Sequence, residues 1–175
     1  LASHLRGTNI FMDMYDDPEY VARLLDYTSS IGEEMARLYR EAGADVLASV
    51  DPLVSQISPD HFEEFLSEPY GRLFERIRSL GVFSSFFVCG DATRNIEVMC
   101  KTGPDGISID ENINMAEAKA ITDRYDVTIA GNIPLASVML FGNQQDNMKV
   151  VIDVLDAVDH HNLIVSPGCD MPYDT

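Results

Sequence analysis

The chain has 175 residues, of which 46% are hydrophobic and 23% are charged, as expected for one globular domain with a sizeable core. Its 29 acidic residues against 12 basic ones give a net charge of −17, and such a surface repels nucleic acid phosphates and anionic lipid, so neither is an expected partner. No uncharged apolar run of about 18 residues is present to span a membrane, and no leader pattern indicates secretion.

Helical patterns open the chain. Pro18 is typical of a first helical turn and precedes a helix predicted over residues 19–26. A second helix is predicted over residues 30–41, and Gly43 ends it. Its inward face is expected to carry the apolar side chains that recur at helical spacing, namely Ile31, Met35, Leu38 and Tyr39.

Short apolar runs and helices then alternate. The first predicted strand covers residues 45–50, and Ser58 with Pro59 marks the start of a helical region that runs to Leu80 with a break near Pro69. Further strands are predicted at 84–89, 106–109, 127–130 and 163–166, separated by helices at 92–101, 115–124 and 143–158. Asn114 is the expected N-cap of the middle one of these three helices.

Strands separated by helices of about 10 to 20 residues indicate parallel βαβ units. This alternation is compatible with an open doubly wound sheet and with a (β/α)8 barrel. No Gly-rich phosphate fingerprint follows a strand, which disfavours the nucleotide-binding version of the open sheet. A complete barrel typically needs about 250 residues, so this α/β chain is predicted to be a partial (β/α)8 TIM barrel with parallel strands.

The predicted strand ends carry the residues best suited to chemistry. In parallel α/β folds, ligands bind beyond the carboxyl ends of the strands. The residues at those ends are small, acidic or thiol-bearing: Asp51 and Pro52; Cys89, Gly90 and Asp91; Asp110 and Glu111; Gly131 and Asn132; Gly168, Cys169 and Asp170. The opposite ends lack this pattern, which indicates a functional rim on one side of the sheet.

The three cysteines are odd in number and widely spaced, which favours free thiols in a reducing cytoplasm over a disulfide framework. Cys100 lies in a predicted helix and is expected in the core. Cys89 and Cys169 both follow strands, so they are expected to approach each other at the carboxyl ends. Two thiolates with a carboxylate such as Glu111 would suit zinc. The alternative is that Cys89 is a buried strand residue and Cys169 a turn residue.

Motifs at these strand ends resemble those of the uroporphyrinogen decarboxylase superfamily. They occur in the family's order and spacing: LASHLRGT at the start, GADVLASVDPLVSQISPDHFEEF (43–65), VCGD (88–91), GISIDENINMAEAK (106–119), AGNIP (130–134) and VSPGCDMP (165–172). The resemblance covers essentially the whole chain. It implies that residues 1–175 are the C-terminal part of a family barrel.

The turn after the last strand separates the two chemistries of this superfamily. True decarboxylases carry a histidine in a Gly-His-Gly turn there and decarboxylate a cyclic tetrapyrrole without a cofactor. This chain reads Pro167-Gly168-Cys169, which is similar to the corrinoid-dependent methyltransferase branch. The resemblance therefore implies a methyltransferase that moves a methyl group between a small substrate, a thiol or a methyl ether, and a corrinoid protein. A uroporphyrinogen decarboxylase of porphyrin biosynthesis is the alternative.

The methyltransferase branch holds zinc through His-x-Cys and a distant cysteine, so the resemblance implies a zinc site. The first of these motifs reads Phe87-Val88-Cys89 here, without the histidine. The expected ligands are therefore Cys89, Glu111 and Cys169, with Asp51 and Asp91 orienting the substrate or supporting the ligands. A third hypothesis is a non-catalytic module that binds a tetrapyrrole or a partner protein at the same rim.

Overall fold

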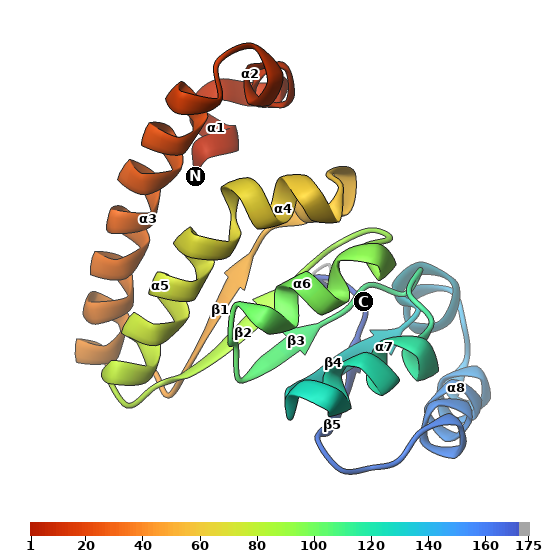
Figure 1. Ribbon diagram of the computed structural model, residues 1–175. Helices are drawn as coiled ribbons and strands as arrows, with labels where there is room; N and C mark the ends of the chain where they lie inside the picture. Colours follow the sequence, from red (N-terminus) through yellow and green to blue (C-terminus); the bar gives the residue numbers. More distant parts are fainter. Residues whose placement is uncertain (172–175) are drawn as a thin grey trace.

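A computed structural model describes residues 1–171 as a sheet of five parallel strands with helices packed on it (Figure 1). The strand order is β1-β2-β3-β4-β5, and each strand pairs in parallel with the next. The strands are β1 (Val46–Val50), β2 (Phe83–Phe87), β3 (Gly106–Ser108), β4 (Thr128–Ile133) and β5 (Leu163–Pro167). All five predicted parallel strands are confirmed. Pro172, the last residue of the VSPGCDMP motif, lies outside the described residues.

Three helices precede the first strand, and the others connect successive strands, as parallel pairing requires. They are α1 (Ala2–Arg6), α2 (Ile10–Asp16), α3 (Pro18–Glu41), α4 (Pro59–Phe65), α5 (Ser67–Ser79), α6 (Ile96–Lys101), α7 (Met115–Thr122) and α8 (Gln144–Ala157). Short helical turns complete the connections: η1 (Gly7–Asn9), η2 (Pro52–Gln56), η3 (Thr93–Asn95), η4 (Asp123–Tyr125) and the π-helix η5 (Leu135–Leu140). None of the described helices is both long and apolar enough to cross a membrane.

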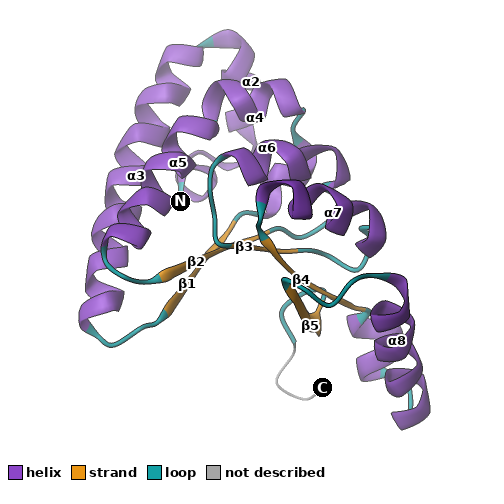
Figure 2. Ribbon diagram, turned by 60° about the horizontal axis from the view of Figure 1, so that its bottom comes forward, coloured by secondary structure: helices purple, strands orange, loops and turns teal. Residues whose placement is uncertain are grey.

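The helices lie on one side of the sheet, which curls like part of a barrel wall (Figure 2). On the helix side, Phe86 and Val88 are fully buried. The other face is open, and its side chains Val46, Phe83 and Ile164 are between 54% and 66% exposed. The fold is therefore a partial (β/α)8 barrel, as predicted, and within residues 1–171 nothing covers the face that would be the barrel interior.

An aromatic cluster packs helices α4 and α5 against the sheet. The ring centroid of Phe86 on β2 lies 4.3 Å from that of Tyr70, 5.5 Å from that of Phe74 and 6.2 Å from that of Phe62. Close, tilted aromatic pairs of this kind add to the stability that burial alone provides. The cluster also sets the position of the Tyr70 hydroxyl, which reaches the end of β1.

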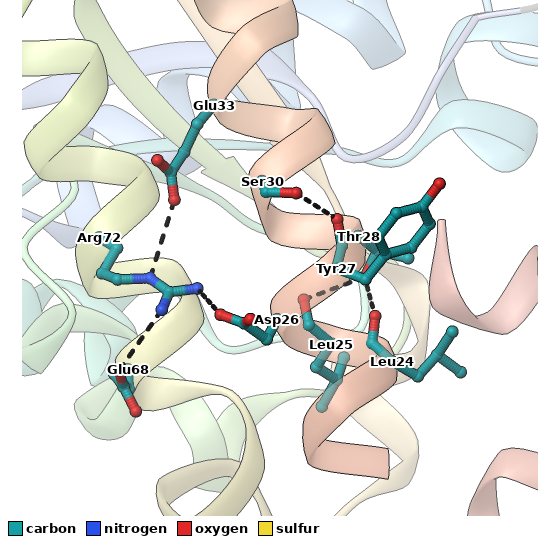
Figure 3. Close-up of polar contacts among 9 residues, drawn as sticks. All are labelled: Leu24, Leu25, Asp26, Tyr27, Thr28, Ser30, Glu33, Glu68 and Arg72. Carbon is teal, nitrogen blue, oxygen red and sulfur yellow. Dashed lines mark hydrogen bonds and ion pairs between the residues drawn. The ribbon is translucent and has the colours of Figure 1, made fainter. Parts of the chain in front are cut away.

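The predicted break at residues 27–29 is wrong, because α3 is continuous there. Threonine disfavours helix interiors, since its hydroxyl competes for backbone groups. Here the Thr28 hydroxyl donates to the carbonyl oxygens of Leu24 (2.9 Å) and Leu25 (3.1 Å), and Ser30 makes a similar bond (Figure 3). The hydroxyls are satisfied within the helix, so the helix does not end.

The apolar face predicted for the second part of α3 is not buried. Its side chains are between 37% and 50% exposed: Ile31, Met35, Leu38 and Tyr39. A groove of about 720 Å³ lies between α3 and β1, with Gly32 on one side and Leu47 on the other. The helix thus reaches past the free edge of the sheet, and the described chain does not fill the space beneath it.

Two predicted N-caps are confirmed, and one predicted break is displaced. The side-chain oxygens of Ser58 and Asn114 each accept a hydrogen bond from the backbone N–H three residues later, at 3.2 and 3.1 Å. The helical region after Ser58 breaks at Leu66, between α4 and α5, which is three residues before Pro69, near which a break or bend was predicted. Pro69 falls in the first turn of α5, where a missing N–H costs no helical hydrogen bond.

Arg72 of α5 pairs with two carboxylates of α3 and with one of its own helix, Glu68. Its guanidinium nitrogens lie 2.7 Å from Asp26, 3.7 Å from Glu33 and 3.5 Å from Glu68 (Figure 3). The hydrogen bond that Arg72 donates to Asp26 is the main cause of a raised pKa for Arg72. A network of this kind stabilises more than an isolated surface pair does.

Replacing Arg72 with Met is expected to lower the free energy of unfolding by about 1 kcal/mol, near the upper end for partly exposed ion pairs. Arg23→Met is the matched control, because Arg23 forms one pair with Glu19 at 3.7 Å, and we expect it to change stability little. Urea unfolding at low and high salt measures both. A loss for Arg72→Met that equals that of the control would contradict a network contribution.

Candidate functional site

Cys89 and Cys169 lie just beyond the carboxyl ends of β2 and β5. Two strands separate β2 from β5, so in a flat sheet these ends would be about 14 Å apart, at about 4.8 Å per strand. The two sulfur atoms are instead 3.5 Å apart. The curl of the sheet brings them together, so their predicted approach is confirmed.

The turn that carries Cys89 is held by a buried carboxylate. Gly90 has φ +80°, and a Cβ there would lie 2.9 Å from the Ser55 hydroxyl, so the position requires glycine. Its backbone N–H donates to Asp110 Oδ2 at 2.7 Å, and the N–H of Asn112 donates to Asp110 Oδ1 at 2.9 Å. Asp110 is 7% exposed, and these bonds fix the main chain next to the Cys89 thiol.

The turn that carries Cys169 packs directly against the end of β3. A Cβ on Gly168 would lie 2.6 Å from the backbone nitrogen of Glu111, so only glycine permits this approach. The N–H of Gly168 donates to the carbonyl oxygen of Ile133 at 3.0 Å. Because β4 extends to Ile133, the prediction that Gly131 and Asn132 follow the strand is wrong, and both lie inside it.

Glu111 has its backbone beside this turn, but its carboxylate points elsewhere. Oε2 accepts a hydrogen bond from the backbone N–H of Leu135 at 2.5 Å. Within residues 1–171, no group of three or more His, Cys, Asp or Glu side chains is arranged to hold a metal ion. The structure thus brings together Cys89 and Cys169 of the three expected ligands, and metal binding stays a prediction.

The electrostatic surroundings keep Cys89 protonated. Burial, followed by the hydrogen bond with Cys169 and the negative charges of Asp110 and Asp170, raises the pKa of the Cys89 thiol to about 12. A bound cation would reverse this preference, because metals bind thiolates and release protons. The Cys89 thiol is therefore neutral at pH 7 unless a positive charge joins it.

Asp51 was expected to orient the substrate, but both of its carboxylate oxygens accept hydrogen bonds from the protein itself. The Tyr70 hydroxyl donates to Oδ2 at 2.9 Å, and the Leu53 N–H donates to Oδ1 at 3.1 Å, so Asp51 caps η2. Burial raises the pKa of Asp51, and the bond from Tyr70 opposes the rise. Burial and the nearby carboxylate also raise the pKa of Tyr70 well above its usual value.

Replacing Asp51 with Asn should be nearly neutral for stability at low pH and favourable at neutral pH. The asparagine oxygen can accept from Leu53, and its NH₂ can donate to the Tyr70 oxygen. Because the folded-state pKa of Asp51 is raised, its contribution to stability is complete below the unfolded pKa of about 3.9 and is lost as pH rises through the folded value. The stability of Asp51→Asn relative to the parent should therefore increase from pH 3.5 to pH 7, at about the pH values where that carboxylate ionises.

Thermal melting across this pH range is the measurement. Asp51→Ala is the comparison variant, and it should be destabilised by about 1–3 kcal/mol, since it leaves the Tyr70 hydroxyl without its partner. An Asp51→Asn protein that loses stability relative to the parent as pH rises would contradict the raised pKa.

Asp91 is exposed, and its carboxylate accepts hydrogen bonds from the turn that follows it. Its Oδ1 accepts from the Thr93 hydroxyl at 2.6 Å and from the Thr93 N–H at 3.1 Å. These bonds, the side-chain one foremost, lower the pKa of Asp91, so it is ionised at neutral pH. Cys100, by contrast, is 3% exposed in α6, as predicted, and burial raises its pKa to about 12.

Sequence reasoning placed Asp110 at the rim but missed its role in holding the Cys89 turn. It also missed that the Asn132 side-chain NH₂ donates to the carbonyl oxygens of Asp110 (3.1 Å) and Ile113 (2.6 Å). The only signal was an Asp and an Asn near the ends of successive strands. Such residues commonly cap turns, but the partner of each depends on the sheet geometry.

Comparison with known proteins adds a family relationship. A family model described as "Uroporphyrinogen decarboxylase (URO-D)" matches residues 1–175. Methylcobamide:CoM methyltransferase MtbA of Methanosarcina acetivorans is 29% identical over 97% of this chain and 49% of its own length. Methylcobamide:CoM methyltransferase MtaA of Methanosarcina barkeri is 30% identical, also over 97% of this chain and 49% of its own length.

Decarboxylases and a solved structure also match. Uroporphyrinogen decarboxylase of Prochlorococcus marinus is 27% identical over 88% of this chain and 44% of its own length. A solved methyltransferase from Methanosarcina mazei superposes with a TM-score of 0.88 at 23% identity, over 97% of this chain and 50% of that one, so the two share this fold. The chain spans about half the length of the curated relatives it matches.

Proposed function

Because the chain belongs to the uroporphyrinogen decarboxylase (URO-D) family, we propose that residues 1–175 are the C-terminal part of a family barrel that works as a corrinoid-dependent methyltransferase. The enzyme would move a methyl group between a small substrate and a corrinoid carried on a partner protein. Among the small substrates, a thiol or a methyl ether, we favour a thiol, because the names of the methyltransferase relatives couple methylcobamide with CoM.

One observation carries this proposal: the thiols of Cys89 and Cys169 meet at 3.5 Å beyond the carboxyl ends of the strands. That is the end of a parallel α/β fold at which ligands bind. A decarboxylase that uses no cofactor has no need of paired thiols. Because uroporphyrinogen decarboxylases are also among the relatives, decarboxylation is the alternative function that the tests must distinguish.

The thiol pair suits a zinc ion. With Zn–S bonds of about 2.3 Å and a tetrahedral angle, two thiolate ligands lie about 3.75 Å apart, close to the observed separation. We propose Glu111 as the third ligand, since its backbone already lies against Gly168, and its carboxylate would have to leave the Leu135 N–H. When bound, zinc would act as a Lewis acid that favours the thiolate form of a substrate thiol.

The surrounding carboxylates would position the site and not react themselves. Asp110 fixes the Gly90 N–H and so the main chain of Cys89. Asp51 holds Tyr70 and the start of η2, and Asp91 holds the turn after Gly90. We therefore propose Asp51 and Asp91 as residues that shape the rim around the substrate, in agreement with the supporting role expected of them.

The free edge of β1 supports the proposal that this chain is part of a longer barrel. Among residues 1–171, β1 pairs only with β2, and its other edge borders the groove beneath α3. A further parallel strand in this groove would continue the sheet and cover the exposed apolar side chains of α3. An edge strand with apolar surroundings otherwise favours aggregation.

Elemental analysis of the full-length protein tests the metal part of the proposal. Purification under reducing conditions with zinc supplied should give about one zinc per chain, as in a single catalytic site. A protein without zinc after this treatment would favour the decarboxylase or a non-catalytic binding module.

A further inference from the structure

We infer that Cys89 and Cys169 form a reversible oxidation site, at which a hydroperoxide converts the two thiols into one disulfide. The inference uses the same thiols as the proposed function but does not depend on the metal. Its consequence for that function is direct, because the disulfide would occupy both proposed sulfur ligands.

The distance between the sulfurs carries the inference. They are already in contact at 3.5 Å, and a disulfide bond is about 2.05 Å long, so each sulfur would move by less than about 1 Å. Both residues are half-buried, so a small oxidant can reach the pair. No unfolding is needed to bring the two chain segments together, although they are separated by 80 positions.

The movement requires only that the two cysteine side chains rotate, while the turns that carry them keep their main-chain contacts. Cys89 is two residues beyond β2 and Cys169 two residues beyond β5, so neither sulfur belongs to a residue of a paired strand. Gly90 follows the first and Gly168 precedes the second. Small shifts of the side-chain torsions at these turns would leave the strand hydrogen bonds unchanged.

The chemistry proceeds in two balanced steps. One cysteine attacks the peroxide as its thiolate, and the proton it gives up passes to the departing RO⁻, so that Cys–SH and ROOH give Cys–SOH and ROH overall. The second thiol then attacks the sulfenic sulfur, which forms the S–S bond and releases water. The peroxide takes up the two electrons that the thiols lose, and a dithiol reductant reverses the reaction by thiol–disulfide exchange.

Cys100 provides an internal comparison. It is buried in α6, and no other cysteine sulfur among the described residues is in contact with it. Oxidation of Cys100 would therefore give an oxygen acid of sulfur and no disulfide, or would not occur. A variant that lacks Cys100 should behave like the parent, and one that lacks Cys169 should not.

The experiment treats the reduced, metal-free full-length protein with hydrogen peroxide and maps the peptides by mass spectrometry. We expect a peptide pair that links Cys89 to Cys169, with the loss of two hydrogen atoms, in the parent and in Cys100→Ser. Dithiothreitol should restore both thiols. Cys169→Ser should give no crosslink at Cys89.

Three outcomes would overturn the inference: sulfenic or sulfinic acid at Cys89 and Cys169 without a crosslink, a crosslink to Cys100, or a crosslink between chains. A parallel sample loaded with zinc separates this inference from the proposed function. If the disulfide forms but zinc neither binds nor protects the thiols, the metal proposal fails alone. If zinc binds but no disulfide forms in the metal-free protein, the oxidation site fails alone.

Discussion

Replacing Cys169 with Ser is expected to abolish methyl transfer and reduce zinc affinity by more than about 100-fold, a loss greater than that from changing a residue that only supports a ligand. A thiolate is a soft, charged ligand, whereas a serine hydroxyl is harder and far less acidic. The fold should remain, because the shape of this turn comes from Pro167 and from the close approach of Gly168 to Glu111. Zinc content, methyl transfer and thermal melting, measured on the full-length protein, are the three readouts.

Cys100→Ser is the matched control for this variant. Cys100 is buried in α6 and away from the strand ends, so its replacement should cost at most a modest amount of stability and leave zinc content unchanged. A Cys169→Ser protein that keeps full methyl transfer would remove the thiol pair from the mechanism. Equal effects of the two substitutions would indicate that thiol loss acts through the fold.

Replacing Phe86 with Ala is expected to lower the free energy of unfolding by about 3–5 kcal/mol, as for other fully buried aromatic side chains. Phe86 has no exposed surface and packs against Tyr70 at a ring centroid distance of 4.3 Å. Its loss would leave a cavity between β2 and α5 and remove the support of the Tyr70 hydroxyl that binds Asp51. A loss of this size is a large part of the total stability of a domain.

Phe141→Ala is the control, because Phe141 is 80% exposed and should change stability by less than about 0.5 kcal/mol. Denaturant unfolding compares the two variants. If Phe86→Ala lost no more stability than Phe141→Ala, the aromatic cluster would not be the core that joins the helices to the sheet.

The sequence predicted those parts of the fold that depend on short-range patterns. Apolar runs located all five strands, and local capping chemistry located Ser58 and Asn114. The sequence analysis predicted two helices, over residues 19–26 and 30–41, whereas α3 is continuous and the Thr28 hydroxyl binds the preceding turn of the same helix. The exposure of its apolar face was missed because periodicity shows which side chains share a face but not what covers that face.

The candidate site was predictable in part for a similar reason. The position of Cys89 and Cys169 after strands led to the expectation that they meet, and the sulfur distance agrees. The orientation of the Glu111 carboxylate toward Leu135 could not be foreseen, because it depends on the path of the chain after β4. The bond from the Gly90 N–H to Asp110 likewise arises only when β2 and β3 are paired.

Methyl transfer itself is the most direct test of the proposed function. The full-length protein is incubated with methylcobalamin and the thiol CoM under reducing conditions with zinc, and loss of the methylcobalamin absorbance is followed. The account predicts demethylation that requires the thiol, the protein and both Cys89 and Cys169. Absence of demethylation, together with decarboxylation of uroporphyrinogen by the same preparation, would contradict it.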